Sequence, residues 1–198
     1  MVQLAEKAKN PGNKTITSGF SELTYGAAAT IKAFIARSGS AMARRQMVFV
    51  MPAPATAAFE AFHNHGKRLE WDTLLSKAEV EGGGTYPYVG AVTLNVGRGA
   101  LHGPGMRTRF VSYEPPRLAA ATIVEPTGLF AYWGASMRHR DLPDGTSELI
   151  YTFNLKLRPR LLGMLFDPLA ARVFAHETRR RFTAMAAWLE ANQATKRG

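Results

Sequence analysis

Residues 46–62 of the chain read QMVFVMPAPATAAFEAF, and this stretch carries the clearest signal for the architecture. Its first six residues form a short, dense apolar run that stops at two prolines, a pattern typical of a buried strand. Pro54 suits the first turn of a helix, because the amide hydrogen that proline lacks would have no partner there. The helix ends at Gly66, and its apolar face is formed by Ala58, Phe59 and Phe62. The stretch therefore predicts a strand that leads directly into an amphipathic helix.

Downstream of this unit the sequence predicts a second short helix and then a run of strands. The helix is placed around residues 68–75, with an apolar side formed by Leu69, Trp71, Leu74 and Leu75. After a glycine turn, strand patterns cover residues 89–96, 107–113, 117–124, 130–140 and 148–157. Pro143, Asp144 and Gly145 form a hairpin turn between the last two strands. Strands so closely spaced, without helical crossovers, predict an antiparallel sheet.

A long amphipathic helix closes the chain. Asp167 is suited to cap it and Pro168 to be its first residue. Apolar residues then recur at helical spacing until about Asn192, namely Val173, Phe174, Phe182, Met185, Ala186 and Leu189. About 25 residues give a rod of roughly 37 Å, long enough to cross a whole sheet. The sequence predicts an α+β fold in which a curved antiparallel sheet of about six to seven strands wraps around this helix and leaves a cavity between the layers.

Four features in this order carry a resemblance to a known family: VFVMPAPATAAFEAF, RLEWDTLL, YEPPRLAA and the terminal helix. Together they resemble the START-like superfamily, also called SRPBCC, with its helix-grip fold. Within it they are most similar to the bacterial polyketide cyclase/dehydrase-like proteins. The resemblance implies a deep, largely apolar cavity between sheet and terminal helix that holds a hydrophobic small molecule. It implies less about reaction, because members include lipid carriers, hormone receptors and cyclases.

The resemblance also sets the expected domain boundaries. It covers residues 44–192, which are expected to form one START-like ligand-binding domain. Residues 1–43 lie outside it as an N-terminal extension, a polar tail followed by a short helix near residues 21–39. Residues 193–198 are expected to be a disordered tail.

Candidate ligand-binding residues follow from the alternation of side chains along strands. Along residues 130–140 the expected inner set is Ala131, Trp133, Ala135, Met137 and His139, and along residues 148–157 it is Leu149, Tyr151, Phe153 and Leu155. Together with apolar residues elsewhere, the candidates for the cavity lining are Trp71, Leu75, Phe110, Trp133, Met137, Tyr151, Phe153, Phe174, Phe182 and Met185. Each alone is explained as well by a hydrophobic core. As a set, rings with polar tips suit a cavity that offers some hydrogen bonds.

His139 is the candidate catalytic residue. Placed in the inner set between the outward Arg138 and Arg140, it would suit proton transfer next to a substrate carbonyl near neutral pH. The alternative, which the sequence favours, is a histidine at the rim of a strand end. Glu177 and Arg181, four residues apart on the terminal helix, are interpreted as a surface ion pair rather than a catalytic couple.

Several other classes of site lack their sequence patterns. The chain has no cysteine, so disulfides, thiolate metal sites and a cysteine nucleophile are excluded. His63 and His65 have no third ligand at useful spacing, and a position near the helix C-terminal dipole explains them. The glycines of residues 97–103 fit no phosphate loop, and GxSxG is missing. We therefore expect no metal and no cofactor.

The net charge of +10 is the unusual bulk property, with 25 Lys and Arg against 15 Asp and Glu. Such an excess is typical of proteins that bind nucleic acid, anionic membranes or acidic ligands, but also of a merely solvated surface. The basic runs are widely spaced and do not interleave with aromatic residues, so nucleic acid is not favoured. No run is apolar enough to span a bilayer and no secretory signal is present, so a cytoplasmic protein is expected. The oligomeric state stays open, a homodimer included.

Three functional hypotheses remain. The first is a protein that binds a hydrophobic small molecule, such as a lipid, polyketide or aromatic compound, in the cavity. The second is a cyclase or dehydratase that acts on a polyketide-like substrate in the same cavity, with His139 as the proton-transferring group. The third is a basic module for RNA or a membrane surface, which requires the arginines at 44, 45, 138, 140 and 179–181 to share one face. The sequence does not decide whether the protein is an enzyme.

Overall fold

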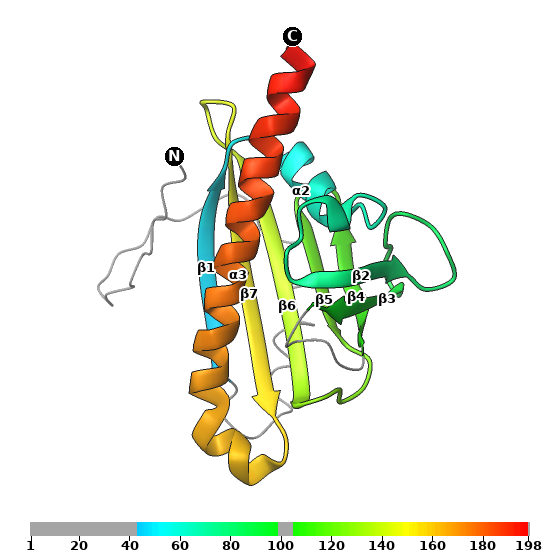
Figure 1. The fold of residues 1–198 in the computed structure, drawn as a ribbon, viewed down its shortest axis with the longest axis vertical. Helices are drawn as coiled ribbons and strands as arrows, with labels where there is room; N and C mark the ends of the chain where they lie inside the picture. Colours follow the sequence, from blue (N-terminus) through cyan, green and yellow to red (C-terminus); the bar gives the residue numbers. More distant parts are fainter. Residues whose placement is uncertain (1–42, 99–104, 198) are drawn as a thin grey trace, which may run out of the picture.

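The computed structural model describes residues 43–98 and 105–197 (Figure 1). The elements follow one another as β1 (Ala43–Met51), α2 (Ala55–His63), the 3-10 turn η1 (Arg68–Glu70), β2 (Leu75–Val80), β3 (Val92–Gly97), β4 (Met106–Glu114), β5 (Leu118–Ile123), β6 (Phe130–Asp141), β7 (Ser147–Leu157) and α3 (Arg160–Arg197). The expected short helix near residues 21–39 and most of the glycine segment 97–103 lie outside the described residues.

The strands form one curved antiparallel sheet of seven strands in the order β1-β7-β6-β5-β4-β3-β2. The first strand pairs with the last, so β1 joins the edge of a meander that runs from β2 to β7. α3 lies along β1 and β7 on the inner face of the sheet, and α2 packs over β6 and β7 on the same face (Figure 1). The α+β helix-grip fold expected from the sequence is confirmed.

The core lies between α3 and the strands beneath it. The expected inner residues of β7 (Leu149, Tyr151, Phe153 and Leu155) are all buried, as are Phe182, Met185 and Leu189 of α3. Burial of one large apolar side chain contributes about 1.5–3 kcal/mol, so this interface holds α3 firmly on the sheet. In β4 the register shifts between Phe110 and Ser112, and this bulge lets Phe110 and Tyr113 both contact α2 through Phe59 and His63.

The second helix predicted around residues 68–75 is wrong in extent. Only Arg68–Glu70 form a turn of 3-10 helix, and Leu75 begins β2, a strand that the sequence analysis missed. The helix stops because the Asp72 carboxylate bonds back to its own segment: its Oδ1 accepts the backbone N–H of Leu74 at 3.2 Å. The chain then pairs with β3 from Leu75 onward.

The terminal helix is longer at both ends than predicted. Asp167 is not its cap: α3 begins at Arg160, Pro168 lies inside it, and the Asp167 carboxylate accepts the backbone N–H of Leu157 at 2.9 Å. At the other end α3 continues past Asn192, where the sequence pattern ended, to Arg197. The side chain of Gln193 donates to the carbonyl of Pro52 at 2.7 Å, which ties this last part of the helix to the β1–α2 connection.

Candidate ligand-binding site

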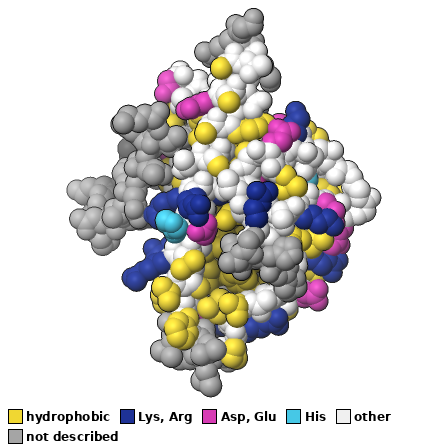
Figure 2. Space-filling view, in the orientation of Figure 1, with side chains coloured by type: hydrophobic (Ala, Val, Ile, Leu, Met, Phe, Trp, Pro, Cys, Tyr) yellow, Lys and Arg dark blue, Asp and Glu magenta, His cyan; other side chains and the backbone are white. Residues whose placement is uncertain are grey.

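The inner face of the sheet is covered unevenly. The inward side chains of β7 are buried beneath α3 and α2. On β5 and β6, however, the inward side chains of Ala121, Trp133 and Ala135 stay half-buried, as does Phe174 on α3. These four residues, here called the inner apolar surface, mark a part of the layer boundary that the described residues do not close. Figure 2 shows hydrophobic side chains gathered between the lower half of α3 and the middle of the sheet.

All the residues predicted to line a cavity lie within the fold, but they divide into two groups. Trp133 and Phe174 belong to the inner apolar surface and pack on each other, with ring centres 6.1 Å apart. The remaining candidates are buried side chains: Trp71, Leu75, Phe110, Met137, Tyr151, Phe153, Phe182 and Met185. Phe153, Phe182 and Met185 are fully enclosed and build the core under α3. A role of any of these residues in binding stays a prediction.

Trp133 combines a half-buried ring with an unpaired polar atom. Its Nε1–H is buried and has no hydrogen-bond partner among the described residues. A buried donor without a partner costs about 1–3 kcal/mol. Ala135, two residues further along β6 on the same face, is half-buried and carries only a methyl side chain.

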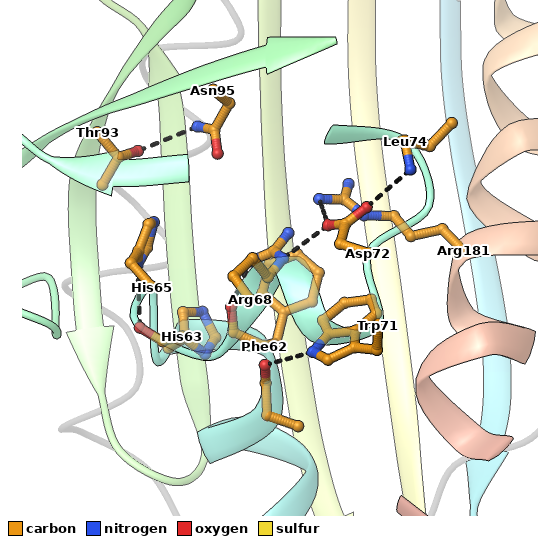
Figure 3. Close-up of polar contacts among 11 residues, drawn as sticks. Phe62, His63, His65, Arg68, Trp71, Asp72, Leu74, Thr93, Asn95 and Arg181 are labelled. Atoms are coloured by element: carbon orange, nitrogen blue, oxygen red, sulfur yellow. Dashed lines mark hydrogen bonds and ion pairs between the residues drawn. The ribbon is translucent and has the colours of Figure 1, made fainter. Parts of the chain in front are cut away.

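A buried ion cluster lies where η1 meets α3 (Figure 3). The Asp72 carboxylate accepts from Arg68 Nε at 2.7 Å and from Arg181 Nε and Nη2 at 2.8 and 2.6 Å, all through one oxygen, Oδ2. The exposed side-chain fractions are 4% for Arg68, 0% for Asp72 and 12% for Arg181. These three residues, here called the ion cluster, therefore form charge-assisted hydrogen bonds away from bulk water.

The sequence analysis missed this cluster and placed Arg181 wrongly. Glu177 pairs with Arg180 on the surface, at 3.3 Å, while Arg181 turns inward to Asp72. The hypothesis of a basic module requires Arg181 to lie on a basic surface with Arg179 and Arg180. Because Arg181 points to Asp72 instead, it does not contribute to such a surface. A signal was present: Arg181 occupies the same helical stripe as Thr178 and Met185, both buried.

Aromatic rings enclose the ion cluster. The Arg68 guanidinium carbon lies 3.6 Å from the ring centre of Phe62 and 5.0 Å from that of Trp71, and that of Arg181 lies 5.1 Å from Phe62. Such cation–π contacts stabilise a desolvated guanidinium. The Trp71 Nε1–H is itself anchored, donating to the Ala61 carbonyl at 2.9 Å, so α2, η1 and α3 meet at this cluster.

The charge states of the ion cluster follow from competing effects. Burial and then the charge of Arg181 lower the pKa of Arg68 to about 10, although the charge and hydrogen bond of Asp72 oppose both. Burial by itself would raise the pKa of Asp72, but the charges and hydrogen bonds of Arg181 and Arg68 outweigh it and hold that pKa below its ordinary value. At neutral pH, Arg68 is thus protonated and Asp72 ionised, and Arg181 carries the usual arginine charge.

His63 and His65 are buried at the C-terminal end of α2. His63 Nδ1 lies 2.9 Å from the carbonyl of Phe59, and His65 Nδ1 lies 3.0 Å from that of His63. Burial lowers the pKa of His63 well below its ordinary value and that of His65 to about 4, so both rings are neutral at pH 7. His63 is the last residue of α2, at the helix C-terminus where the sequence places it, and burial keeps its ring uncharged there. Within the described ranges no group of three or more His, Asp or Glu is placed to hold a metal ion.

His139 lies on the inner face at the end of β6 that α2 covers. Its exposed fraction is 6%, and its ring stands edge-on to Phe59 with centres 5.5 Å apart. Neither ring nitrogen has a hydrogen-bond partner among the described residues, and burial lowers its pKa to about 4. His139 is therefore a neutral, enclosed imidazole and not a solvated group at the rim.

Replacing His139 by leucine is expected to raise the free energy of unfolding by about 1–2 kcal/mol, because the variant buries no unpaired polar atom. Urea unfolding at pH 8 measures the change. The exposed His176 on α3, replaced by leucine, is the control and should change stability little. A loss of stability in His139→Leu would mean that the ring has a hydrogen-bond partner in solution.

Seven strands gripping one long helix, with an apolar surface and an ion cluster between them, define a protein of the helix-grip class. The chain belongs to the family described as polyketide cyclase / dehydrase and lipid transport, whose model matches residues 42–190. No curated protein matches the sequence. In the described part of the chain, no helix has the length and hydropathy needed to cross a membrane.

Solved structures share this fold at low sequence identity. The Zhui aromatase/cyclase from a Streptomyces species is 15% identical with a TM-score of 0.62, over 76% of this chain and 94% of that one. A START superfamily protein from Mycobacterium smegmatis is 9% identical with a TM-score of 0.61, over 76% and 99%. Ara h 8.0201 is 12% identical with a TM-score of 0.57, over 76% and 99%. Identities this low establish a common fold and leave the ligand open.

Proposed function

We propose that this protein binds a hydrophobic small molecule between α3 and the inner face of β5 and β6. The observation that carries the proposal is Trp133, whose half-buried ring faces the layer boundary while its Nε1–H lacks a partner among the described residues. A ligand that covers the exposed part of the ring would remove that apolar surface from water.

The composition of the inner apolar surface supports an apolar ligand. Its members are two aromatic rings and two alanines, and the rings of Phe153 and Phe174 continue it toward the core with centres 4.7 Å apart. Covering apolar surface contributes roughly 25 cal/mol per Å², so a compound that fits here gains most of its affinity from burial. Membership of a family whose description includes lipid transport is consistent with such a ligand.

A cyclase or dehydratase reaction on a polyketide-like substrate is the second candidate, favoured by the family and by the fold shared with an aromatase/cyclase. Such a reaction needs a group that moves a proton at the substrate. His139 fits this role poorly, because burial lowers its pKa to about 4 and its nitrogens are enclosed beneath α2. Binding without turnover is therefore the function that the geometry supports better.

The test uses N-phenyl-1-naphthylamine, an uncharged dye that fluoresces in apolar surroundings. We expect saturable binding to the full chain. Ala135→Phe, which places a ring on the inner apolar surface, should weaken binding by about tenfold or more. Ser136→Phe is the matched control, because the next residue of β6 points to the opposite face of the sheet. Equal binding to both variants, or none to the unchanged protein, would contradict the proposal.

A further inference from the structure

The ion cluster carries more positive than negative charge. Two guanidinium groups share a single carboxylate, and its ion pairs with described residues include no second acid. The nearest acids on the same elements are engaged elsewhere: Glu177 pairs with Arg180, and Glu70 accepts from Trp188 Nε1 at 3.2 Å. His63 and His65 are neutral at pH 7 because burial lowers their pKa values. The cluster therefore holds a net charge of about +1 at a buried position.

A buried charge without a counter-ion is costly. The carboxylate of Asp72 cannot compensate the second guanidinium, because both of its oxygens already accept hydrogen bonds. Asp72 Oδ2 already accepts three N–H bonds, and Oδ1 accepts the Leu74 amide. Taking an ion out of water costs several kcal/mol unless a partner of opposite charge replaces the water. The surplus guanidinium charge is thus a reason for an anion to bind at this place.

Three donors remain available around the cluster. Among the described residues no hydrogen bond is formed by Arg68 Nη2, Arg181 Nη1 or the Tyr151 hydroxyl. Tyr151 lies close enough to feel the charges of Arg181 and Arg68, yet burial dominates and raises its pKa to about 12, so it keeps its proton at neutral pH. Two guanidinium N–H groups and one hydroxyl match the two oxygens of a carboxylate.

The cluster adjoins the inner apolar surface along β7. Tyr151 and Phe153 are alternate residues on the same face of that strand, and Ala135 pairs with Phe153. Trp133 pairs with Leu155, two residues further along. At the rise of a β-strand, the distance from Tyr151 to the level of Trp133 is roughly 13 Å. A single elongated molecule with one end at the ion cluster would have to span this distance past the fully buried Phe153 to reach the half-buried Ala135, Trp133 and Phe174.

We propose that the ligand is an amphiphilic acid: its carboxylate binds Arg68, Arg181 and Tyr151, and its hydrocarbon part covers Ala135, Trp133 and Phe174. This inference rests on the proposed function, since it names the chemical class of the molecule held in the same space. The competing interpretation is that the ion cluster only fastens η1 to α3 and contacts no ligand.

The first measurement compares dodecanoate with dodecan-1-ol as competitors for bound N-phenyl-1-naphthylamine at pH 7.5. The two molecules have the same hydrocarbon chain, and the alcohol avoids the desolvation of a charge, so a purely apolar site favours the alcohol. We expect dodecanoate to compete at a concentration about tenfold lower than dodecan-1-ol. Equal potency, or a preference for the alcohol, would overturn the inference and leave the proposed function standing. Failure of the dye to bind at all would overturn both.

Two variants separate a binding role from a structural role. Arg181→Gln removes one cation and should weaken the binding of dodecanoate by about tenfold. The affinity for dodecan-1-ol should change little. Asp72→Asn removes the internal counter-ion without changing side-chain shape and should raise the affinity for dodecanoate. Both variants are expected to lower stability, so a merely structural cluster predicts weaker binding in both. Opposite changes in dodecanoate affinity support the inference, and parallel losses overturn it.

The matched control is Arg172→Gln. Arg172 is an exposed arginine on α3, so its replacement changes the net charge by the same amount without touching the ion cluster. We expect its dodecanoate affinity to equal that of the unchanged protein. A loss as large as that of Arg181→Gln would mean that dodecanoate responds to the overall positive charge, and it would overturn the assignment to the cluster.

Discussion

Replacing Asp72 by alanine is expected to lower the free energy of unfolding by about 3–5 kcal/mol. The substitution leaves two guanidinium groups facing each other in a buried place, with no carboxylate between them. It also removes the acceptor of the Leu74 amide, which sets where η1 ends and β2 begins. Because a domain of this kind is stable by only about 5–15 kcal/mol, this one change should remove a large part of its stability.

Urea unfolding at pH 8 measures the loss, with two comparisons. Glu79→Ala removes an acid from the exposed pair with Lys77 and should cost less than about 1 kcal/mol. The triple variant Arg68→Met, Asp72→Leu, Arg181→Met removes all three charges together and should recover most of the lost stability. If Asp72→Ala lowers the free energy of unfolding no more than Glu79→Ala does, the cluster is hydrated and its charges are not isolated from water.

The residues on the inner face of the sheet could be predicted because successive side chains of a strand point to opposite faces. In β7 every second residue from Leu149 to Leu155 is large and apolar, and a shift by one residue would place them all in water. The same argument placed Met137 and His139 on the inner face of β6, where both are buried. Outside the segment of η1 and β2, the order of strands and helices followed from turn residues and from the change of hydrophobic period.

The segment from Arg68 to Val80 could not be predicted in the same way. Apolar residues at 69, 71, 74 and 75 fit a helical face, but in the structure Leu69 is 42% exposed while Trp71 is buried. The local hydrogen bond from the Leu74 amide to Asp72 and the pairing of β2 with β3 prevail over that spacing. A periodicity over so few residues is weaker than one tertiary contact.

The ion cluster was hidden for a related reason. Asp72 and Arg181 lie 109 residues apart in the chain, and the sequence offers Arg181 a nearer partner in Glu177. Helical spacing allows an ion pair between Glu177 and Arg181. Only the packing of α3 against η1 determines that Arg181 pairs with Asp72 instead. The apolar candidates were easier to find than the charged ones, because burial selects residue type whereas ion pairing depends on three-dimensional proximity.

Lowering the pH from 8 to 5 is expected to reduce the free energy of unfolding by about 6 kcal/mol through three buried histidines. Burial lowers the pKa of His63 well below 6.5, and lowers those of His65 and His139 from 6.5 to about 4. In the unfolded chain each ring binds a proton near pH 6.5. In the folded protein His65 and His139 stay neutral until about pH 4, and His63 stays neutral until well below 6.5. Between these values the unfolded state binds more protons, so stability falls as the pH falls, by about 2 kcal/mol for each ring at pH 5.

Urea unfolding curves at intervals from pH 8 to pH 4.5 measure this dependence. The free energy of unfolding should change little with pH above pH 7 and should fall steeply below pH 6.5. The loss of stability begins there because the histidines of the unfolded chain take up protons. His139→Leu gives the internal comparison: it removes one of the three groups, so its loss between pH 8 and pH 5 should be smaller by about 2 kcal/mol. Because the same variant is expected to be more stable at pH 8, its advantage should grow on acidification. An advantage that stays constant with pH would show that His139 takes up its proton as readily in the folded protein as in the unfolded chain, and that the ring is open to water.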